Sequence, residues 1–264
     1  MESGLTTPGT DYDPVRALRR ILLEKGGSLH ALCVMPSPDV TEIVARGGFD
    51  WIMLDMQHAL VDRQTIANMI RALDAARVPA LVRASWNRPD LVGWVLDAGA
   101  AGVLAPMVNS AQETRELVKA CRYAPAGSRS WGALRTMAAR PDYSTEVGNE
   151  VLVGAMIETA EGVENVDAIL DEGRPDFIYV GQSDLAISFG LQPAEARTND
   201  GHVARVRQII DACVRRDRPI VISCDSPEEA KRLKAIGCGH LCVGTDFSLL
   251  RRAISAVIKS YRES

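Results

Sequence analysis

Eight short apolar runs alternate along this chain with amphipathic stretches of helical periodicity. Apolar strands separated by helices are typical of a parallel sheet whose faces are covered by those helices. Eight such units in 264 residues match one closed (β/α)8 barrel, which needs roughly 250 residues, better than an open doubly wound sheet. The predicted strands are residues 29–34, 51–54, 80–82, 102–105, 151–157, 177–180, 220–223 and 240–243.

We therefore predict one α/β domain, a TIM barrel over residues 13–264, preceded by a flexible amino-terminal segment of residues 1–12. Glycine-rich segments at 46–50, 97–102 and 235–239 come directly before predicted strands. Glycine at such positions commonly ends the preceding helix.

Composition and charge exclude several classes of protein. A net charge of −4 gives no support for binding to nucleic acid or to a membrane surface. No apolar run approaches the ~18 residues of a membrane span, and residues 1–4 lead into no apolar signal region. From these absences we expect a cytoplasmic location. The six cysteines show no CxxC spacing, so we expect reduced, structural thiols.

Two carboxylates stand where predicted buried strands end. Glu158 follows the run 151–157, and Asp184 follows the run 177–180 after a three-residue link. If the strands are neighbours in a parallel sheet, the two acids converge at one mouth and suit a hard divalent cation. Two alternatives remain open: Glu158 could pair with a lysine or arginine, and Asp184 could cap the following helix.

Three further polar residues are candidates for chemistry. His58 lies four residues beyond the second predicted strand, Arg83 ends the third, and Asp97 ends the next helical stretch. A loop histidine bonded to a carbonyl, a surface salt bridge and a helix-terminal acid are the respective structural alternatives. Together with the carboxylates they suggest an enolisation site, in which arginine stabilises an oxyanion and histidine moves a proton.

The longest irregular segment, residues 123–143, contains Gly127 and Arg129. Long loops in compact domains are usually functional or disordered. We expect this segment on the catalytic face as a substrate-facing loop, with a subunit contact as the alternative.

Several sequence blocks, in order, resemble the HpcH/HpaI aldolase family of metal-dependent pyruvate aldolases. The blocks span residues 16–258 and read FDWIMLDMQHALVD, PALVRASWN, LDAGAAGVLAPMV, RYAPAGSRSWG, IETAEGVENV, YVGQSDLAISFG and CVGTDFSLL. The resemblance implies a TIM barrel that uses Mg2+ or Mn2+, with Co2+ as a further option. It implies reversible aldol cleavage of 4-hydroxy-2-oxo acids to pyruvate or hydroxypyruvate plus an aldehyde. It also implies a homohexamer, a trimer of dimers that exchange their last helix, here about residues 248–261.

Matched by motif, Glu158 and Asp184 correspond to the family's metal ligands and His58 to its catalytic base. Arg83 corresponds to the arginine that stabilises the enolate. Asp97 corresponds to an acid that assists the histidine, reaching it through a partner subunit.

Ser183 occupies the position where the family binds the substrate carboxylate through backbone amides, and Gly127 and Arg129 lie in its mobile loop. Two residues depart from the family pattern at substrate-binding positions. Gln57 replaces a glutamate and removes a negative charge from the site, and Met156 replaces a glutamine and cannot donate a hydrogen bond.

Other functions remain open on these residues. One is a related metal-enolate reaction at the same site, such as a citryl- or malyl-type lyase or an oxaloacetate decarboxylase. Another is a catalytically weakened barrel that binds a 2-oxo acid, with Gln57 and Met156 marking the lost chemistry.

Overall fold

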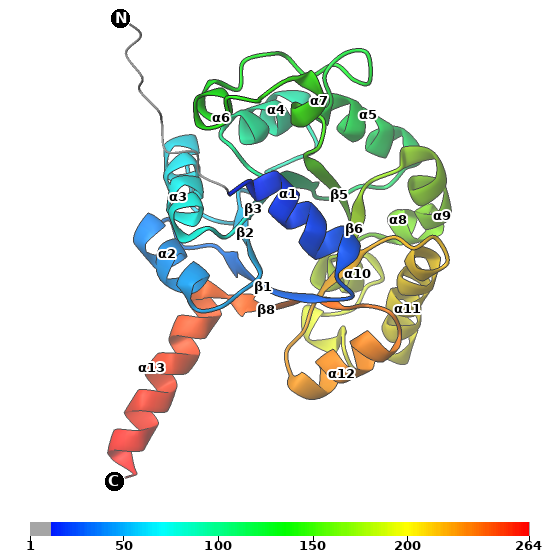
Figure 1. Ribbon diagram of the computed structural model, residues 1–264. Helices are drawn as coiled ribbons and strands as arrows, with labels where there is room; N and C mark the ends of the chain where they lie inside the picture. Colours follow the sequence, from blue (N-terminus) through cyan, green and yellow to red (C-terminus); the bar gives the residue numbers. More distant parts are fainter. Residues whose placement is uncertain (1–11, 264) are drawn as a thin grey trace, which may run out of the picture.

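The computed structural model describes residues 12–263, which form a closed barrel of eight parallel strands in chain order (Figure 1). Strand β1 pairs with both β2 and β8, and this pairing closes the sheet. The predicted (β/α)8 barrel is confirmed, and every predicted strand is present within two residues at either end. The strands are β1 Ser28–Cys33, β2 Trp51–Asp55, β3 Ala80–Arg83, β4 Gly102–Ala105, β5 Leu152–Ile157, β6 Phe177–Val180, β7 Ile220–Ser223 and β8 His240–Thr245.

Helices surround the barrel, and their ends follow local sequence rules. Asp62, Ser110 and Ser226 each accept a hydrogen bond from a backbone amide of the helix that they precede. The main helices are α1 Pro14–Arg19, α2 Pro38–Arg46, α3 Arg63–Ala76, α4 Pro89–Asp97, α5 Ala111–Cys121, α10 Gln182–Ser188, α11 Asp200–Val214, α12 Pro227–Ala235 and α13 Asp246–Arg262. Shorter helices are α6 Leu134–Ala139, α7 Thr145–Gly148, α8 Ala160–Glu164 and α9 Val166–Ala168.

Strand register decides which side chains enter the barrel. The last residues of β2 and β3, Asp55 and Arg83, are direct partners in the register, as are Met156 of β5 and Tyr179 of β6. Side chains alternate along a strand, so Met156 and Glu158 lie on the same face. The carboxyl ends of the strands therefore collect a layer of polar side chains above an apolar core.

The opposite, amino-terminal end of the barrel is covered by α1, which lies across it in Figure 1. Arg19 of α1 donates to the carbonyl of Glu150, just before β5, at 3.1 Å. Residues 123–143 also lie at this end, where Arg122 donates to the carbonyl of Val151 at 2.7 Å and Arg140 pairs with Asp13 at 2.9 Å.

The expectation that residues 123–143 lie on the catalytic face is thus wrong within one protomer. The segment follows α5, not β4 directly, and a helix in this fold runs antiparallel to the strands. Helix α5 therefore carries the chain back to the amino-terminal end before the segment begins.

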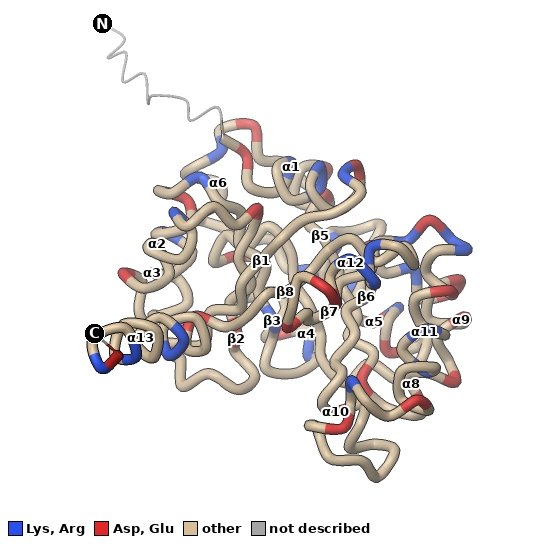
Figure 2. The backbone as a smooth tube through the Cα atoms, turned by 90° about the horizontal axis from the view of Figure 1, so that it is seen from below, with Lys and Arg blue, Asp and Glu red and all other residues tan. Residues whose placement is uncertain are grey.

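Helix α13 leaves the barrel wall and extends away from the body in both views (Figures 1 and 2). One stripe of this helix is apolar, and Phe247, Leu250, Ile254, Val257 and Ile258 are between 47% and 55% exposed. The predicted last helix, residues 248–261, is confirmed as a helix. Its exchange between subunits stays a prediction.

The remaining expectations concern the termini, the thiols and membranes. The predicted flexible segment lies outside the described residues except for its last residue, Tyr12. All six cysteines are free and buried. Among residues 12–263, no helix combines the length and apolarity that crossing a bilayer requires.

Candidate active site

Glu158 lies at the carboxyl end of β5 and is 1% exposed. Its Oε1 accepts a hydrogen bond of 2.8 Å from the backbone amide of Met107, a residue held at φ +54° in the loop after β4. A non-glycine residue in this conformation is uncommon and is frequent at ligand sites. Gly181 lies so close that a Cβ there would be 2.3 Å from Glu158 Oε2. Glycine is therefore required where the end of β6 passes the carboxylate.

Asp184 is the third residue of α10, whose N-cap is Gly181, so the helix-cap alternative for Asp184 is wrong. Burial raises the pKa of Glu158 to about 7, and the negative charge of Asp184 adds to this rise. The amide of Met107 and the charge of Arg83 oppose the rise without cancelling it. The two predicted metal ligands therefore lie close enough to repel each other.

Neither carboxylate forms an ion pair with a lysine or arginine of the described residues, so the salt-bridge alternative for Glu158 is not observed. A buried acid beside a half-buried one, neither with a cationic partner, fits a divalent cation, because a cation would neutralise both charges. Within residues 12–263 no group of three or more His, Cys, Asp or Glu side chains has metal-binding geometry. A cation held by Glu158 and Asp184 would take its other ligands from water and substrate.

Arg83 is held at the same mouth by Asp55, which is 1% exposed. Arg83 Nε donates to Asp55 Oδ1 at 2.8 Å and Nη2 donates to Oδ2 at 2.6 Å, a two-point fork that fixes the plane of the guanidinium. Burial would lower the pKa of Arg83, but the hydrogen bond and the charge of Asp55 raise it above its ordinary value. Nη1 has no partner among the described residues and is free to donate.

Asp55 is a functional residue that the sequence reasoning missed. It is the last residue of the apolar run 51–55, and it pairs in register with Arg83. The sequence clue to this pair was that two oppositely charged residues end consecutive strands. A charge at the end of a buried strand needs a partner, and the neighbouring strand end is the nearest place for one.

His58 lies in the loop after β2, three residues beyond Asp55, and is exposed. It has no hydrogen-bond partner in the described part of the chain, so the alternative of a histidine bonded to a backbone carbonyl is not observed. Both ring nitrogens are free to reach a molecule bound at the mouth.

The two departures from the family pattern lie at this mouth as well. Met156 is 1% exposed and lies two residues before Glu158 on the same strand face. Gln57 is half-buried, and its side-chain oxygen is buried without a hydrogen-bond partner. Ser183, in the first turn of α10, is exposed beside Asp184.

Tyr179 is a second residue that the sequence reasoning missed. It is 6% exposed on the inner face of β6, and burial together with the neighbouring Cys242 raises its pKa well above the ordinary value. The charge of Arg83 opposes this rise, which places the phenol near the guanidinium. The sequence did offer a clue. Tyr179 lies two residues before Gly181, and alternate residues of a strand share one face, so its side chain could be expected on the same face as the site.

Asp97 and Arg129 are not brought to this mouth within one protomer. Asp97 is the last residue of α4 and lies at the amino-terminal end, where Arg129 Nη2 donates to its carboxylate at 2.9 Å. The Arg129 guanidinium lies 4.7 Å from the centre of the Tyr123 ring. Gly127 also lies at the amino-terminal end. It packs tightly against α5, because a Cβ there would be 2.3 Å from the carbonyl oxygen of Lys119.

Comparison with known families matches residues 34–222 to the family described as HpcH/HpaI aldolase/citrate lyase. Similar curated proteins include the 4-hydroxy-2-oxo-heptane-1,7-dioate aldolases of Escherichia coli and Salmonella arizonae. Each is 33% identical, over 222 and 225 residues respectively, which covers 82% of this chain and 83% of the relative.

Solved structures give the same picture. A HpcH/HpaI aldolase/citrate lyase family protein from Burkholderia cenocepacia J2315 superposes with a TM-score of 0.87 at 25% identity, covering 95% of this chain and all of the other. The citrate synthase SbnG superposes with a TM-score of 0.84 at 28% identity, covering 95% and 98% of the two chains.

Proposed function

Because the chain belongs to the HpcH/HpaI aldolase/citrate lyase family and is a carbon–carbon lyase, we propose that it cleaves 4-hydroxy-2-oxo acids reversibly. The products are pyruvate or hydroxypyruvate and an aldehyde. The observation that carries this proposal is the carboxylate pair of buried Glu158 and half-buried Asp184, at the same mouth as the free Nη1 of Arg83.

Glu158 and Asp184 hold a divalent cation in this proposal, Mg2+ or Mn2+, with Co2+ as a further option. When bound there, the cation supplies a Lewis acid that polarises the 2-oxo group of the substrate. The raised pKa of Glu158 supports this assignment, since a cation between the carboxylates relieves the repulsion that contributes to it.

Arg83 stabilises the oxygen that becomes negative as the enolate forms. Asp55 occupies Nε and Nη2 and leaves Nη1 to donate to that oxygen. A guanidinium fixed by two hydrogen bonds needs no reorganisation when the charge develops, which is the main source of electrostatic catalysis. Asp55 is thus a positioning residue, acting through Arg83.

His58 takes the proton from the C4 hydroxyl as the C3–C4 bond breaks to release the aldehyde, and a proton is returned to C3 of the enolate. It is the exposed histidine of this mouth, and both its nitrogens are free. The backbone amides at the start of α10, around Ser183, bind the substrate carboxylate. Met156 gives that part of the site an apolar wall, so substrate selection there depends on shape more than on hydrogen bonding.

We also propose a homo-oligomer, which the exposed apolar stripe of α13 supports. A groove of about 430 Å³, lined by Leu29, Pro227, Ala230 and Val243 among others, lies between α12 and strands β1 and β8. Leu29, on the outer face of β1, is 41% exposed there. The helix that would cover this face in a closed barrel projects away instead, so α13 of a second copy fits the groove. The proposed assembly is a trimer of dimers, located in the cytoplasm, where buried free thiols stay reduced.

The test of the reaction uses metal-free protein with Mn2+, Mg2+ or Co2+ restored, pyruvate or hydroxypyruvate, and a panel of aldehydes, with products detected by mass. Metal-dependent formation of 4-hydroxy-2-oxo acids is expected. Equal cleavage rates in chelator-treated and Mn2+-loaded protein would show the mechanism to be wrong.

The alternatives are separated by two added measurements. Oxaloacetate and acyl-CoA substrates in the same assay test the decarboxylase and thioester-lyase functions. The similarity to a citrate synthase structure is the reason to include them. Proton exchange at the pyruvate methyl group in D2O tests the weakened binding barrel, which would leave those protons in place.

The assembly is tested by light scattering of the purified chain. Ile254→Glu with Ile258→Glu places charges on the α13 stripe and should reduce the particle mass, whereas the matched pair Lys259→Glu and Arg262→Glu on the same helix should not. An unchanged mass in the first variant would exclude helix exchange.

A further inference from the structure

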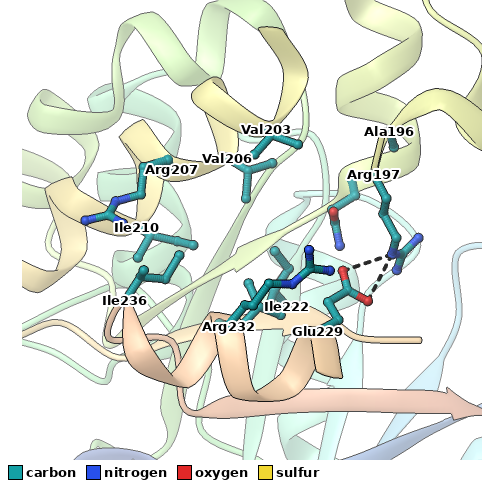
Figure 3. Close-up of a pocket in the computed structure, with 12 residues that line it drawn as sticks. Ala196, Arg197, Val203, Val206, Arg207, Ile210, Ile222, Glu229, Arg232 and Ile236 are labelled. Atoms are coloured by element: carbon teal, nitrogen blue, oxygen red, sulfur yellow. Dashed lines mark hydrogen bonds and ion pairs between the residues drawn. The ribbon is translucent and has the colours of Figure 1, made fainter. Parts of the chain in front are cut away.

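A second cavity lies outside the barrel, in the groove between α11 and α12 (Figure 3). Its volume is about 310 Å³, within the range of small-molecule sites. The outer face of β7, at Ile222, forms part of its wall. The proposed active site lies at the carboxyl end of the barrel, so strands β6 and β7 separate it from this groove.

The floor of this groove is apolar. Val206, Ile210 and Leu233 line it and are no more than 8% exposed, while Val203 at its edge is 48% exposed. In Figure 3 the valine and isoleucine side chains of α11 and the side chain of Ile236 point toward one another across the cavity. A polar or strongly hydrated molecule would lose its water here without compensation, so an occupant has an apolar body.

Three arginines line the groove, with Arg207 and Arg197 at opposite ends of it in Figure 3 and Arg232 between them. Arg197, Arg207 and Arg232 line the groove against a single acid, Glu229, so its lining carries a net charge of +2. Arg197 donates to Glu229 at 3.0 and 3.2 Å and pairs with Asp225 at 3.0 Å, and Arg207 pairs with Asp211 at 2.7 Å. Arg232 has no partner among the described residues.

In Figure 3 dashed lines join the carboxylate of Glu229 to Arg197, and none joins it to Arg232. The exposed Arg232 guanidinium thus lines the cavity with its five donors unpaired among the described residues. An anionic group bound to Arg232 would place an attached hydrocarbon chain along Val206 and Ile210.

We propose that this groove binds a small organic anion with an apolar chain, of the medium-chain carboxylate class. The carboxylate pairs with Arg232, and the chain lies on the floor between α11 and α12. Gln182 lines the same cavity and donates to the carbonyl of Ser223 at 2.9 Å, and it immediately precedes Ser183 and Asp184 in α10. The site therefore contacts the helix that carries a proposed metal ligand, although the inference itself concerns binding and does not depend on the reaction.

The test measures binding of hexanoate, octanoate and decanoate to the full-length, Mg2+-loaded protein by calorimetry and saturation-transfer NMR. Each added methylene should tighten Kd roughly threefold to fourfold until the groove is filled. Octanamide, which has the same chain and no charge, should bind at least about tenfold more weakly than octanoate.

Variants locate the binding. Arg232→Ala changes an exposed side chain and should weaken octanoate about tenfold, whereas the matched control Arg71→Ala, an exposed arginine of α3, should leave Kd unchanged. Val206→Trp fills the floor and should abolish binding. Glu158→Gln should not alter octanoate affinity, which separates this site from the metal centre and keeps the outcome independent of the proposed function.

Three results would overturn the proposal: no saturable octanoate binding, equal affinity of octanoate and octanamide, or loss of binding in Glu158→Gln with retention in Arg232→Ala. A fall in particle mass in Arg232→Ala or Val206→Trp would also overturn it, because it would assign the groove to a second copy of the chain.

Discussion

Both ends of the barrel carry carboxylate and arginine side chains, but within residues 12–263 two carboxylates at the carboxyl end lack an arginine or lysine partner, whereas Asp97 at the other end has one. At the carboxyl end, Glu158 and Asp184 have no cationic partner among the described residues, and Arg83 keeps Nη1 free. At the amino-terminal end, Arg129 pairs with Asp97 and covers an aromatic ring. Unbalanced charge costs free energy unless a ligand balances it. The difference supports the proposal that the first end binds ligands, whereas the paired charges at the second end hold the fold together.

The largest expected effect comes from removing one of the two unpaired carboxylates at the carboxyl end. Glu158→Gln should lower kcat/KM on the order of a thousandfold, because the cation loses one of two protein ligands and Arg83 alone remains at the oxyanion. Mn2+ affinity, followed by electron paramagnetic resonance, should fall in parallel. In metal-free protein the thermal midpoint should not decrease, since the substitution removes repulsion with Asp184.

Glu161→Gln is the matched control, because Glu161 is an exposed acid three residues further along. It should retain activity. A thermal midpoint that drops only in Glu158→Gln would indicate that the carboxylate stabilises the fold, and the contrast between the two ends would fail.

Asp55→Asn tests whether the two hydrogen bonds from Arg83 to Asp55 position the guanidinium of Arg83. We expect kcat to fall about a hundredfold with little change in KM, and the free energy of unfolding to fall by about 3 kcal/mol, because a buried charge loses its partner. Urea unfolding and steady-state kinetics measure the two effects. Asp90→Asn, which breaks the exposed pair with Arg88, should change the unfolding free energy by no more than about 0.5 kcal/mol.

Asp97→Asn tests whether the amino-terminal end of one protomer serves the mouth of another. If it does, the variant should lose activity by roughly tenfold to a hundredfold, and so should His58→Ala. Mixed oligomers of the two variants should regain activity, because a wild-type His58 then meets a wild-type Asp97 from a different chain.

Mixing His58→Ala with Arg83→Ala is the control, since both residues belong to the same mouth of one protomer. This mixture should recover nothing. Recovery in both mixtures, or in neither, would contradict a site shared between the two ends.

The smallest expected effect is at the apolar wall of the mouth. Met156→Gln adds a hydrogen-bond donor beside the carboxylates and should lower the KM for pyruvate about fivefold, the worth of roughly 1 kcal/mol. Met156→Leu is the control of similar volume and should leave KM unchanged. A fall in KM with leucine as well would show that packing, not hydrogen bonding, limits binding there.

Much of the site was predictable because it lies at strand ends. The strand termini placed Glu158, Arg83 and Asp184 at one edge, and the structure confirms that placement. Asp55 and Tyr179 were missed because their roles depend on strand register, which pairs residues that are 28 and 23 positions from their partners Arg83 and Met156. The segment 123–143 was assigned to the wrong end, since its direction depends on the helix before it.

The sequence by itself determined the order of strands and helices, the helix caps and the residues available at each strand end. These follow from periodicity, side-chain type and short-range hydrogen bonding, which act between near neighbours in the chain. The tertiary structure alone decided that Asp55 holds Arg83, that Gly181 admits the Glu158 carboxylate, and that α11 and α12 leave a groove between them. Those features depend on register and packing between distant segments, where a shift of one residue reverses the face that each side chain occupies.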